Sequence, residues 1–523
     1  MNAHEPRPTS SPGRAFKDTV FEQVENGSYV VYDRLEQKFQ ITNDAWHLYS
    51  HDDVKYAPLP RLPWQPASIP RDYVNDEILF KEISSFFTEH LDIANELLVD
   101  VYASFVMASW RPEDFTVVPY LFFLGPLASG KTRALECFHR LCYRGLMAAS
   151  MSAASLFRAQ EAWHPTLLLD ETEIYNRENM VEVLALLNSG YRRGQYAIRV
   201  EKIDSGSPQI ALFDTFGFKV LAGTQELAAT LQSRCIITPM SRAVKHVHLF
   251  INEIEAENLR NKLLMYRFKR LGQHADVDVS RLSSLINNAR VIELFISPLQ
   301  VAPSEDVRQR LLKCMKQNAQ SRLDAEQASI EARLFDAILK CEANVQSGKI
   351  STQAITEAFN SGLSEKEQAN NRFTGRKVAA LGFEKCRLTG GHAGFYYDCK
   401  LVERLKMRYY PPLPNLTSLS SLTSLIQLPS KTMENTVQGQ TSSEVSEVSE
   451  VDPEPLPKPS VQEVLEHVRS CFREGTMEDW IALANQAGLT RKQAEELFQK
   501  LSGNELFWQD GNDGKTLWRW VKE

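Results

Sequence analysis

The chain has 523 residues, of which 43% are hydrophobic and 24% charged, a length that allows about three or four folded units. Its formal net charge of −7 does not mark the whole chain as a nucleic-acid-binding protein, although a net value hides local segregation of charge. Its eight cysteines contain no CxxC pair, and no apolar run approaches the roughly 18 residues of a membrane span, so we expect a cytoplasmic protein without structural zinc or a membrane segment.

The first 75 residues predict little regular structure. Residues 1–20 are polar, and we expect them to be disordered. Residues 21–75 are predicted to form a small β-containing region, because residues 27–42 alternate apolar and polar side chains around a charged turn, as a β-hairpin does. The five prolines between residues 58 and 70 argue against an interior helix or strand there.

Residues 76–325 alternate helical and strand patterns. Apolar residues recur at helical spacing over 76–109, and short apolar runs then alternate with helical patterns, which is typical of a parallel sheet covered by helices. Strands are expected at residues 120–124, 166–170, 219–223 and 235–238. Residues 250–325 are helical throughout and are expected to form a lid. The predicted fold class of this domain is α/β.

A glycine-rich loop follows the first of these strands. Residues 125–132 read GPLASGKT, in which the glycines let backbone N–H groups face phosphates while the next helix adds its N-terminal dipole. Lys131 can reach the β- and γ-phosphates, and Thr132 can ligate magnesium. We therefore predict a site for ATP and Mg²⁺. Its nucleotide-contacting residues are Gly125, Pro126, Leu127, Ala128, Ser129, Gly130, Lys131 and Thr132.

Two acidic residues end the second strand. Residues 166–171 read TLLLDE, and a strand of an α/β sheet meets its ligand at its carboxyl end. Asp170 is expected to hold magnesium, directly or through water, and Glu171 to polarise the water that attacks the γ-phosphate. Because the pair follows the glycine loop by about 40 residues, it is a much more specific signal than an isolated DE.

Two polar residues flank the last two strands. Thr224 ends the run FKVLAGT, where it could touch the γ-phosphate or the attacking water. Arg234 begins the next run, in LQSRCIITPM. An arginine supplied across a subunit interface stabilises transition-state charge, whereas an isolated arginine is more often a surface salt bridge. In the setting of a P-loop domain we favour the first interpretation for Arg234.

Two further units follow the ATPase pattern. Residues 326–410 show three helical patterns and then a two-stranded wing, so we predict a winged-helix-like α+β domain. Residues 411–459 are rich in Ser, Thr, Glu and Pro and almost free of aromatic residues, so we predict a disordered linker. Residues 460–523 repeat the order of helices and hairpin and are predicted to form a second winged-helix-like domain, which could dock either DNA or protein.

The order GPLASGKT, LLLDE, VLAGT, SRC resembles the AAA+ superfamily over about residues 75–400. It looks most like the helicase branch, with the minichromosome maintenance and viral replicative ATPases and the primase-associated ATPases of plasmids, phages and mobile elements. The resemblance implies that Arg234 acts on a neighbouring subunit in a ring, usually a hexamer. It also implies a sensor at Thr224, where asparagine is usual, and a second sensor at Arg260 or Arg267, of which we prefer Arg260.

The same resemblance indicates where DNA would bind. Residues 196–217 read as two strands around the turn DSGSP, and related helicases place such a hairpin in the ring channel. Basic residues contribute sequence-independent phosphate affinity, although Glu201 and Asp204 dilute the charge here, so an ordinary solvated hairpin is an equal alternative. The third helix of residues 326–410 is also basic. The candidate DNA contacts are Arg192, Arg193, Arg199, Lys202, Arg372, Arg376 and Lys377.

Two functions are compatible with these motifs. The first is a ring-forming DNA helicase or translocase that replicates a mobile element, plasmid or phage-like genome on single-stranded or forked DNA. A separate primase or polymerase would supply priming, since no such constellation precedes residue 75. The second is an ATP-controlled initiator, loader or transcription regulator that binds DNA without unwinding it.

Overall fold

The protein is described here by a computed structural model that divides into two units, Met1–Thr432 and Met433–Glu523. The described residues are 9–42, 49–51, 54–147, 152–170, 180–202, 208–364, 367–411, 426–427, 474–476, 506–510 and 516–520.

Short strands make up the N-terminal region. An antiparallel sheet contains β2 (Gly13–Ala15), β3 (Thr19–Gln23), β4 (Tyr29–Asp33) and β5 (Lys38–Ile41), in that order. A second sheet joins β1 (Thr9–Ser10), β7 (Val54–Ala57) and β6 (Tyr49–His51). The hairpin predicted over residues 27–42 is confirmed as β4–β5. The disorder predicted for residues 1–20 is wrong for residues 9–20, because β1 pairs with β7 and β2 pairs with β3. Backbone hydrogen bonds to these partner strands order a segment that has few apolar side chains of its own.

The helical pattern at residues 76–109 forms two helices, α1 (Asp76–His90) and α2 (Leu97–Ser109). The Asn75 side chain caps α1 by accepting a hydrogen bond from the Ile78 N–H. Every residue of α2 from Leu98 to Ser109 is buried. A short 3₁₀ helix, η1 (Pro112–Asp114), then leads to the central sheet. Helix α2 therefore lies inside the domain and not on its surface.

Five parallel strands form the central sheet, in the order β14-β8-β13-β10-β9. They are β8 (Tyr120–Leu124), β9 (Leu146–Met147), β10 (Leu167–Leu169), β13 (Lys219–Gly223) and β14 (Cys235–Pro239). The four predicted strands are confirmed, and the short β9 is additional. The connections also include α3 (Lys131–Leu141), α4 (Ala153–Trp163), α6 (Met180–Ser189) and α7 (Ala229–Gln232). The chain leaves β8 toward β9 and leaves β13 toward β14, so these neighbours form a switch point in the strand order.

Residues 250–325 are helical as predicted. They form α8 (Glu253–Arg270), α9 (Val279–Leu285), α10 (Ala289–Val301) and α11 (Glu305–Gln327), with the short β15 (Asp276–Val277) between α8 and α9. Their apolar side chains belong to the same hydrophobic core as α1, α2, α3 and one face of the central sheet. These helices therefore pack as part of the same body as the central sheet, and their role as a lid stays a prediction.

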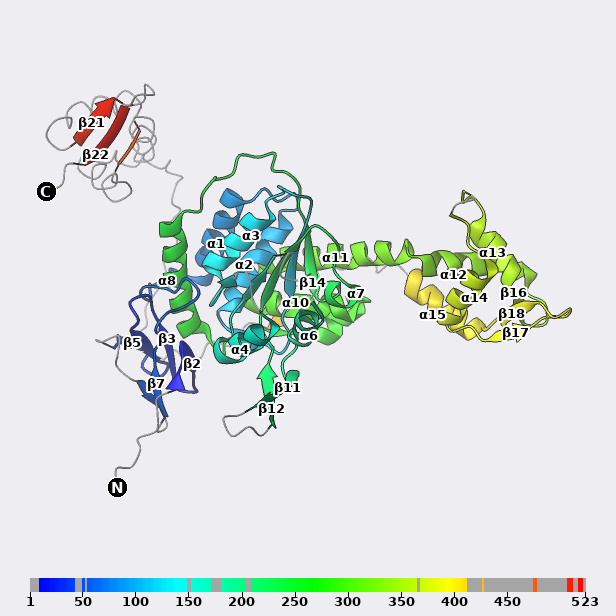
Figure 1. Ribbon diagram of the computed structural model, residues 1–523, viewed down its shortest axis with the longest axis horizontal. Helices are drawn as coiled ribbons and strands as arrows, with labels where there is room; N and C mark the ends of the chain where they lie inside the picture. Colours follow the sequence, from blue (N-terminus) through cyan, green and yellow to red (C-terminus); the bar gives the residue numbers. More distant parts are fainter. Residues whose placement is uncertain are drawn as a thin grey trace, which may run out of the picture. The chain divides into compact units, whose positions relative to one another are not determined.

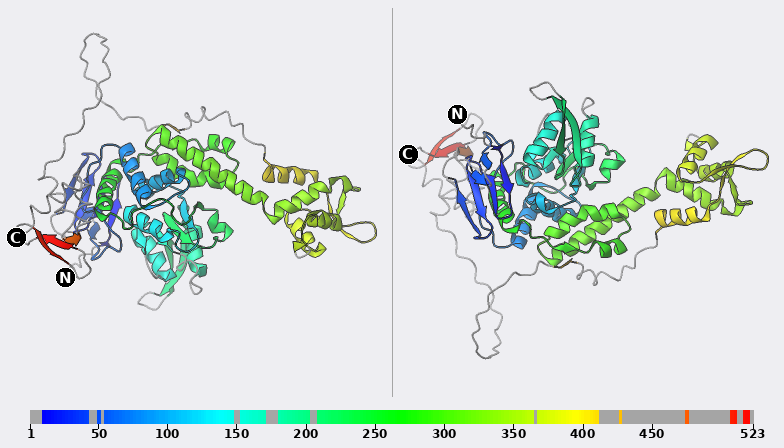
Figure 2. Two further views of the ribbon diagram at one scale, coloured as in Figure 1. Left: turned by 90° about the horizontal axis from the view of Figure 1, so that it is seen from above. Right: turned by 90° about the horizontal axis from the view of Figure 1, so that it is seen from below.

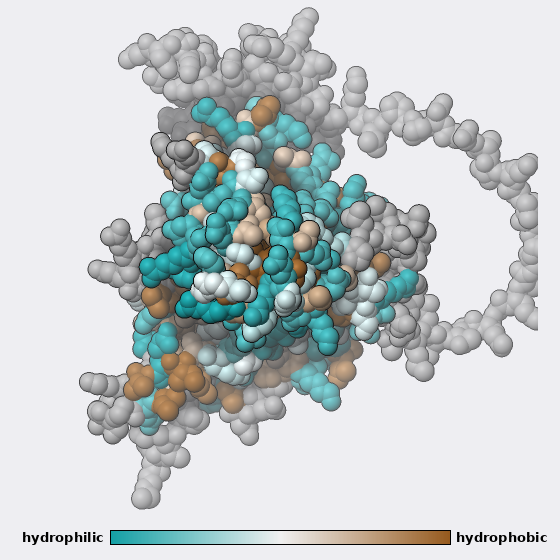
Figure 3. Space-filling model, turned by 90° about the vertical axis from the view of Figure 1, so that its right-hand side faces the viewer, coloured by the Kyte–Doolittle hydropathy of each residue, from teal (hydrophilic) through white to brown (hydrophobic). Residues whose placement is uncertain are grey.

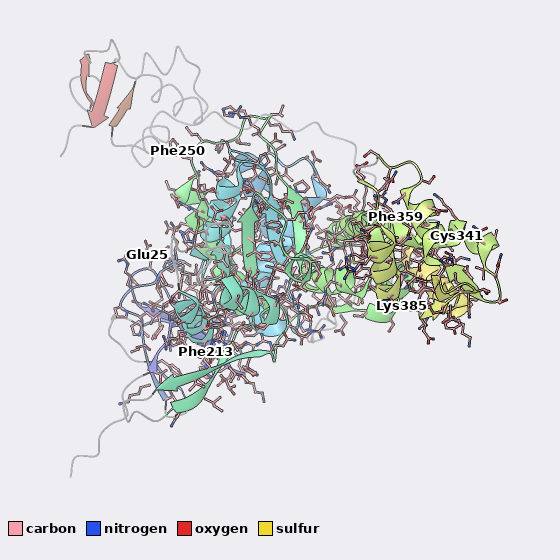
Figure 4. The ribbon with its side chains drawn as sticks, turned by 45° about the vertical axis from the view of Figure 1, so that its right-hand side comes forward. Glu25, Phe213, Phe250, Cys341, Phe359 and Lys385 are labelled. Atoms are coloured by element: carbon pink, nitrogen blue, oxygen red, sulfur yellow. The ribbon has the colours of Figure 1, made fainter. Side chains whose placement is uncertain are left out.

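A β-hairpin projects from this body, as predicted for residues 196–217 (Figure 1). It consists of β11 (Tyr196–Lys202) and β12 (Pro208–Asp214). Phe213 on β12 lies 6.2 Å from Phe157 of α4, so one face of the hairpin packs on that helix (Figure 4). The other face is apolar and exposed, with Ile198 paired to Leu212 and Val200 paired to Ile210. Hydrophobic side chains gather at the lower end of the view in Figure 3, the level at which the hairpin projects in Figure 1.

Residues 330–410 have a hydrophobic core of their own. The elements are α12 (Ile330–Lys340), η2 (Glu342–Asn344), β16 (Lys349–Ser351), α13 (Thr352–Asn360), α14 (Asn371–Ala380), β17 (Lys385–Arg387), β18 (Ala393–Tyr396) and α15 (Cys399–Tyr409). The three predicted helices and the two-stranded hairpin are present, while β16 and α15 are additional. Helix α11 runs from the body around the central sheet into this unit in every view (Figure 2). The assignment as a winged helix stays a prediction.

Little of the remaining chain is described. Residues 426–427 form β19 (Ile426–Gln427), which pairs with β15, and residues 412–425 and 428–459 of the predicted linker lie outside the described residues. The second unit shows β20 (Glu474–Thr476), β21 (Leu506–Asp510) and β22 (Thr516–Trp520) as an antiparallel sheet, which confirms the predicted C-terminal hairpin. Its predicted helices lie outside the described residues. Over the described part of the chain, every helix is too short or too polar to span a bilayer.

Candidate ATP site

The glycine-rich loop folds around the ammonium group of Lys131. It leaves β8 at Gly125 and enters α3 at Lys131, and both Ala128 (φ +60°) and Gly130 (φ +88°) adopt the left-handed conformation. Lys131 is 8% exposed, and its Nζ donates hydrogen bonds of 2.7 Å to the carbonyl oxygens of Gly125 and Pro126. The loop therefore holds a positive charge at the N-terminus of a helix, an arrangement that favours a bound anion.

Gly125 has no room for a side chain. A Cβ atom there would meet the carbonyl oxygen of Met240 at 2.3 Å and the Oγ of Ser129 at 2.8 Å. The Gly125 N–H donates a hydrogen bond of 3.1 Å to the carbonyl oxygen of Gly223, at the end of β13. The loop is thus anchored to the ends of both neighbouring strands. No sequence pattern indicates the contact with Met240, because it depends on where β14 ends.

Asp170 and Thr224 lie at the same edge of the sheet as this loop. Asp170 follows β10 directly and is half-buried, and Thr224 follows β13 directly and is also half-buried. The parallel register aligns these strand ends with the end of β8, because Leu169 is level with Leu221 and Gly223 is level with Leu124. Glu171 lies outside the described residues. The structure therefore brings together three of the predicted catalytic residues, namely Lys131, Asp170 and Thr224.

The described residues fit a nucleotide with its magnesium ion. The Oγ of Ser129 is buried without a hydrogen-bond partner in the described part of the chain, and Thr132 is exposed at the first turn of α3. Within the described ranges, no group of three or more His, Cys, Asp or Glu side chains could hold a metal by itself. Magnesium bound with a nucleotide needs only one or two protein oxygens in addition to phosphates and water. Thr132 and Asp170 can supply those oxygens.

Arg234 lies at the opposite edge of the same sheet. It immediately precedes β14, and its carbonyl oxygen accepts a 3.0 Å hydrogen bond from the N–H of Tyr120, the first residue of β8. The loop begins after the last residue of β8. At about 3.3 Å per residue, these positions are roughly 15 Å apart along the strand. Arg234 is therefore remote from the glycine loop of its own subunit.

The guanidinium group of Arg234 rests on an aromatic ring. Its centre lies 4.7 Å from the ring centroid of Tyr191, which also lies 4.6 Å from the guanidinium of Arg290. One Nη of Arg234 donates to the carbonyl oxygen of Thr230. Its Nε is buried and has no partner among the residues that the structure describes. The side chain is thus supported on one side while part of its donor capacity is unused.

The two candidates for a second sensor are both engaged elsewhere. Arg260 donates to the carbonyl oxygens of Pro66 (3.0 Å) and Arg140 (3.1 Å), and Arg140 lies in the last turn of α3, at the far end from the loop. Arg267 is completely buried and bonds to Glu22 at 2.9 Å and Glu113 at 2.7 Å. The guanidinium of Arg260 joins α8 to α3 and to the N-terminal region, and its assignment as a second sensor stays a prediction.

Three of the basic residues assigned to the hairpin lie at its base or on its packed face. Arg192 forms a 2.5 Å ion pair with Glu293. Arg193 donates to the carbonyl oxygens of Phe115 (3.1 Å) and Pro112 (2.7 Å). Arg199 lies over the ring of Phe157 at 4.4 Å. These guanidinium groups are used within the subunit, so we do not propose them as DNA contacts. The side chain of Lys202 is not among those described.

The basic residues of α14 fall into two groups. Arg372 and Arg376 are exposed, whereas Lys377 forms a 2.8 Å ion pair with Glu331 of α12. Residues 330–410 contain thirteen Lys and Arg residues against nine Asp and Glu residues, although the whole chain is negative. Lys385, on the first wing strand, is also exposed (Figure 4), and the face of this unit turned to the viewer in Figure 3 is mostly hydrophilic. The unit is therefore a local concentration of positive charge.

Comparisons with known proteins give no family. No protein-family model matches the chain, and no curated protein matches it. Solved structures that resemble it include the apo C-terminal region of NrS-1, with a TM-score of 0.30 and 10% identity over 72% of this chain and 96% of that one. A JCV helicase bound to a small molecule has a TM-score of 0.21 and 13% identity, and the match covers 50% of this chain and 64% of that one. A full-length MCM homolog from Methanopyrus kandleri has a TM-score of 0.28 and 10% identity, and the match covers 59% of this chain and 74% of that one. At these TM-scores the similarities support no conclusion about function.

Proposed function

We propose that this chain is an ATPase of the AAA+ helicase type, which assembles into a ring and moves along or unwinds DNA. One observation carries the proposal. The glycine loop, Asp170 and Thr224 lie at the carboxyl ends of the parallel strands, while Arg234 lies at their amino ends, roughly 15 Å away along β8. Each subunit then contains two different halves of a catalytic site. A head-to-tail arrangement that closes into a ring completes a site at every interface.

In such a site, Lys131 and the loop N–H groups bind and orient the phosphates. Thr132 and Asp170 would hold the magnesium ion, which neutralises phosphate charge when bound. Glu171 polarises the attacking water, and Thr224 orients it. The neighbour's Arg234 adds positive charge where negative charge develops in the transition state, a contribution that a preorganised donor makes most effectively in a site that excludes water.

Mixing two inactive variants tests the shared site. Lys131→Ala removes the loop lysine but keeps the finger, and Arg234→Ala does the reverse. Each alone should lose ATP hydrolysis, whereas in an equal mixture about one interface in four combines an intact loop with an intact finger and should recover activity. A mixture that stays inactive, with both variants folded and assembled, would contradict a shared site. Full activity of Arg234→Ala alone would contradict the role of Arg234.

The DNA activity requires a separate assay. We expect single-stranded DNA to stimulate ATP hydrolysis, and a forked duplex to be separated in an ATP-dependent reaction that Glu171→Gln abolishes. Lys202→Ala should lose unwinding while keeping basal hydrolysis, because Lys202 is the predicted channel contact. Hydrolysis without strand separation would overturn the helicase proposal. The replication of a mobile element, plasmid or phage-like genome with a separate primase belongs to this same proposal.

The second candidate is an ATP-controlled initiator, loader or regulator that binds duplex DNA. The exposed Arg372 and Arg376 on α14, within a positively charged unit, favour it. The exposed apolar face of the hairpin, formed by Ile198, Val200, Ile210 and Leu212, is also a poor surface for gripping phosphates. Sequence-specific duplex binding with little stimulation of ATP hydrolysis would identify this function.

A further inference from the structure

A second arginine holds the backbone on both sides of Arg234. Arg322 lies on α11 and is half-buried. Its Nη1 donates to the carbonyl oxygen of Ser233 at 3.0 Å, and its Nη2 donates to the carbonyl oxygen of Cys235 at 2.8 Å. Its Nε donates to Oδ1 of Asn318, one turn earlier on the same helix, at 3.0 Å. Every nitrogen of this planar group therefore has an acceptor, and two of the three acceptors flank Arg234.

These bonds complete the support of a three-residue segment. The carbonyl oxygen of Arg234 itself accepts from the Tyr120 N–H at 3.0 Å, so the carbonyl groups of Ser233, Arg234 and Cys235 are all bonded. The first belongs to the residue that ends α7 and the last begins β14. Without Arg322, the Ser233 carbonyl would lose its bond to α11 and the junction between α7 and β14 would rest on fewer constraints. A guanidinium suits this task because its rigid fork can donate to two acceptors at a fixed spacing.

We propose that Arg322 is a positioning residue for the Arg234 finger. It sets the point from which the Arg234 side chain projects toward a neighbouring subunit, while the Tyr191 ring supports that side chain. Arg322 acts through Arg234, because two of its three acceptors are the carbonyl oxygens of Ser233 and Cys235. This inference rests on the proposed function, because it requires Arg234 to act at the site of another subunit.

Helix α11 also links residues 233–235, which we call the finger segment, to the unit of residues 330–410. Glu326, one turn after Arg322, forms a 2.7 Å ion pair with Arg408 of α15, and Gln327 donates to the carbonyl oxygen of Tyr409 at 2.6 Å. One helix therefore contacts both the finger segment and the positively charged unit of residues 330–410. Arg322 and Glu326 lie on the same side of that helix, since residues four apart are neighbours on a helix surface.

The test measures steady-state ATP hydrolysis by assembled Arg322→Ala. Misplacement of a catalytic group by about 1 Å costs up to about 100-fold in rate, so we expect kcat to fall on the order of 10- to 100-fold. The KM for ATP should stay within about twofold, because the loop is untouched. Asn318→Ala, which removes only the partner of Nε, should give a smaller fall in kcat. Arg322→Lys, which keeps the charge but loses the fork, should recover only part of the activity.

Arg310→Ala is the matched control. Arg310 lies on the same helix and forms a 2.8 Å ion pair with Asp100, and its hydrogen bonds to described residues go to Asp100 and Asp306 instead of residues 233–235. Arg310→Ala should lower the melting temperature, because the buried Asp100 loses its ion-pair partner, and it should leave kcat unchanged. If Arg310→Ala lowers kcat as much as Arg322→Ala, general destabilisation explains both and the proposal fails.

Mixing separates the role of Arg322 from a failure of the proposed function. Arg322→Ala should recover activity when mixed with Lys131→Ala, which supplies intact fingers, and should not recover when mixed with Arg234→Ala. Wild-type kcat in Arg322→Ala, together with inactive Arg234→Ala, overturns the positioning role alone. Wild-type kcat in Arg234→Ala overturns the proposed function first. Should Arg322→Ala not fold, Asn318→Ala and Arg322→Lys carry the same mixing test.

Discussion

The two edges of the central sheet are built in opposite ways. At the carboxyl ends of the strands, a loop contains a buried hydroxyl that has no partner among the described residues, and it binds its lysine through carbonyl groups of the same loop. At the amino ends, basic groups are bonded to the carbonyl oxygens of several different segments, as Lys219 and Arg193 are. We therefore expect the first edge to receive a ligand and the second to hold the fold. Arg234 is the exception at the second edge, because its buried Nε has no partner among the described residues.

The largest expected effect is at the first edge. Lys131→Ala should lower kcat/KM for ATP on the order of 100- to 1000-fold, because it removes a preorganised charge from the transition state. The melting temperature should change little, since the acceptors of Lys131 lie in the loop itself. Lys262→Ala, which removes a lysine paired with Glu82 at 2.7 Å, is the control and should keep hydrolysis intact. A large loss of stability in Lys131→Ala would show that this edge also holds the fold.

A second change at the same edge acts through shape alone. Gly125→Ala places a Cβ 2.3 Å from the carbonyl oxygen of Met240, so the loop must move. We expect ATP hydrolysis to fall on the order of 10- to 100-fold, as it does when reacting groups are displaced by about 1 Å. In the control Gly375→Ala, the nearest atom to the new Cβ is a methyl group of Thr352 at 3.6 Å, and hydrolysis should not change. Equal activity of both variants would show that the loop is not rigid.

At the second edge, Lys219 should affect stability and not catalysis. Its Nζ donates to the carbonyl oxygens of Thr215 (3.0 Å) and Gly217 (2.9 Å) at the start of β13, and burial lowers the pKa of Lys219 to about 7. The unfolded chain, with an ordinary lysine pKa, therefore binds the proton in a window from about pH 7 to pH 10 where the native state does not. Stability from this group therefore rises with pH across that window, and the gain is completely lost once the pH has fallen to about 7.

Urea unfolding at pH 7, 8 and 9 measures this difference. The free energy of unfolding of the wild type, taken relative to that of Lys219→Met, should increase with pH, because the comparison cancels the titration of all other groups. The KM for ATP should be the same in both proteins. Parallel pH profiles of the two proteins would mean that Lys219 keeps its ordinary pKa in the fold.

Arg260→Ala sharpens the same comparison at the far end of α3. Loss of its hydrogen bonds to Pro66 and Arg140 should reduce the free energy of unfolding by about 1–3 kcal/mol, the range for bonds from a charged donor. The kcat for ATP should remain that of the wild type, since the guanidinium lies away from the glycine loop. A fall in kcat without a change in stability would support Arg260 as a sensor and imply that α8 moves during the reaction.

The smallest expected effect is on DNA binding by residues 330–410. Arg376→Ala removes an exposed charge and should reduce the slope of log affinity against log salt by about 1. Lys377→Ala, its neighbour on α14, should have less effect because that lysine is paired with Glu331. Fluorescence anisotropy of labelled duplex DNA over a salt series would measure both. Identical slopes for wild type and Arg376→Ala would remove α14 from the DNA interface.

The sequence was sufficient to predict the elements that have strong local patterns. The strands at residues 120–124 and 219–223 are apolar runs, and the loop GPLASGKT limits its own conformation through its glycines. The sequence was not sufficient to predict elements and side-chain partners that depend on contacts between distant segments. The short strands β1 and β2 have few apolar side chains and pair with β7 and β3, so composition alone predicted disorder there. Likewise, nothing local in Arg192 or Arg193 shows that Glu293 and two carbonyl groups already engage them.

The sequence by itself therefore determined which chemical groups the predicted site contains. A glycine-rich loop, an acidic strand end, a polar strand end and an arginine follow one another in a fixed order, because local backbone geometry and hydrophobic runs encode them. Only the tertiary structure decided where these groups lie relative to one another. The direction of parallel strands sends Lys131, Asp170 and Thr224 to one edge and Arg234 to the other. The length of β8 separates Arg234 from the glycine loop, and under the function proposed above a second subunit would complete the site.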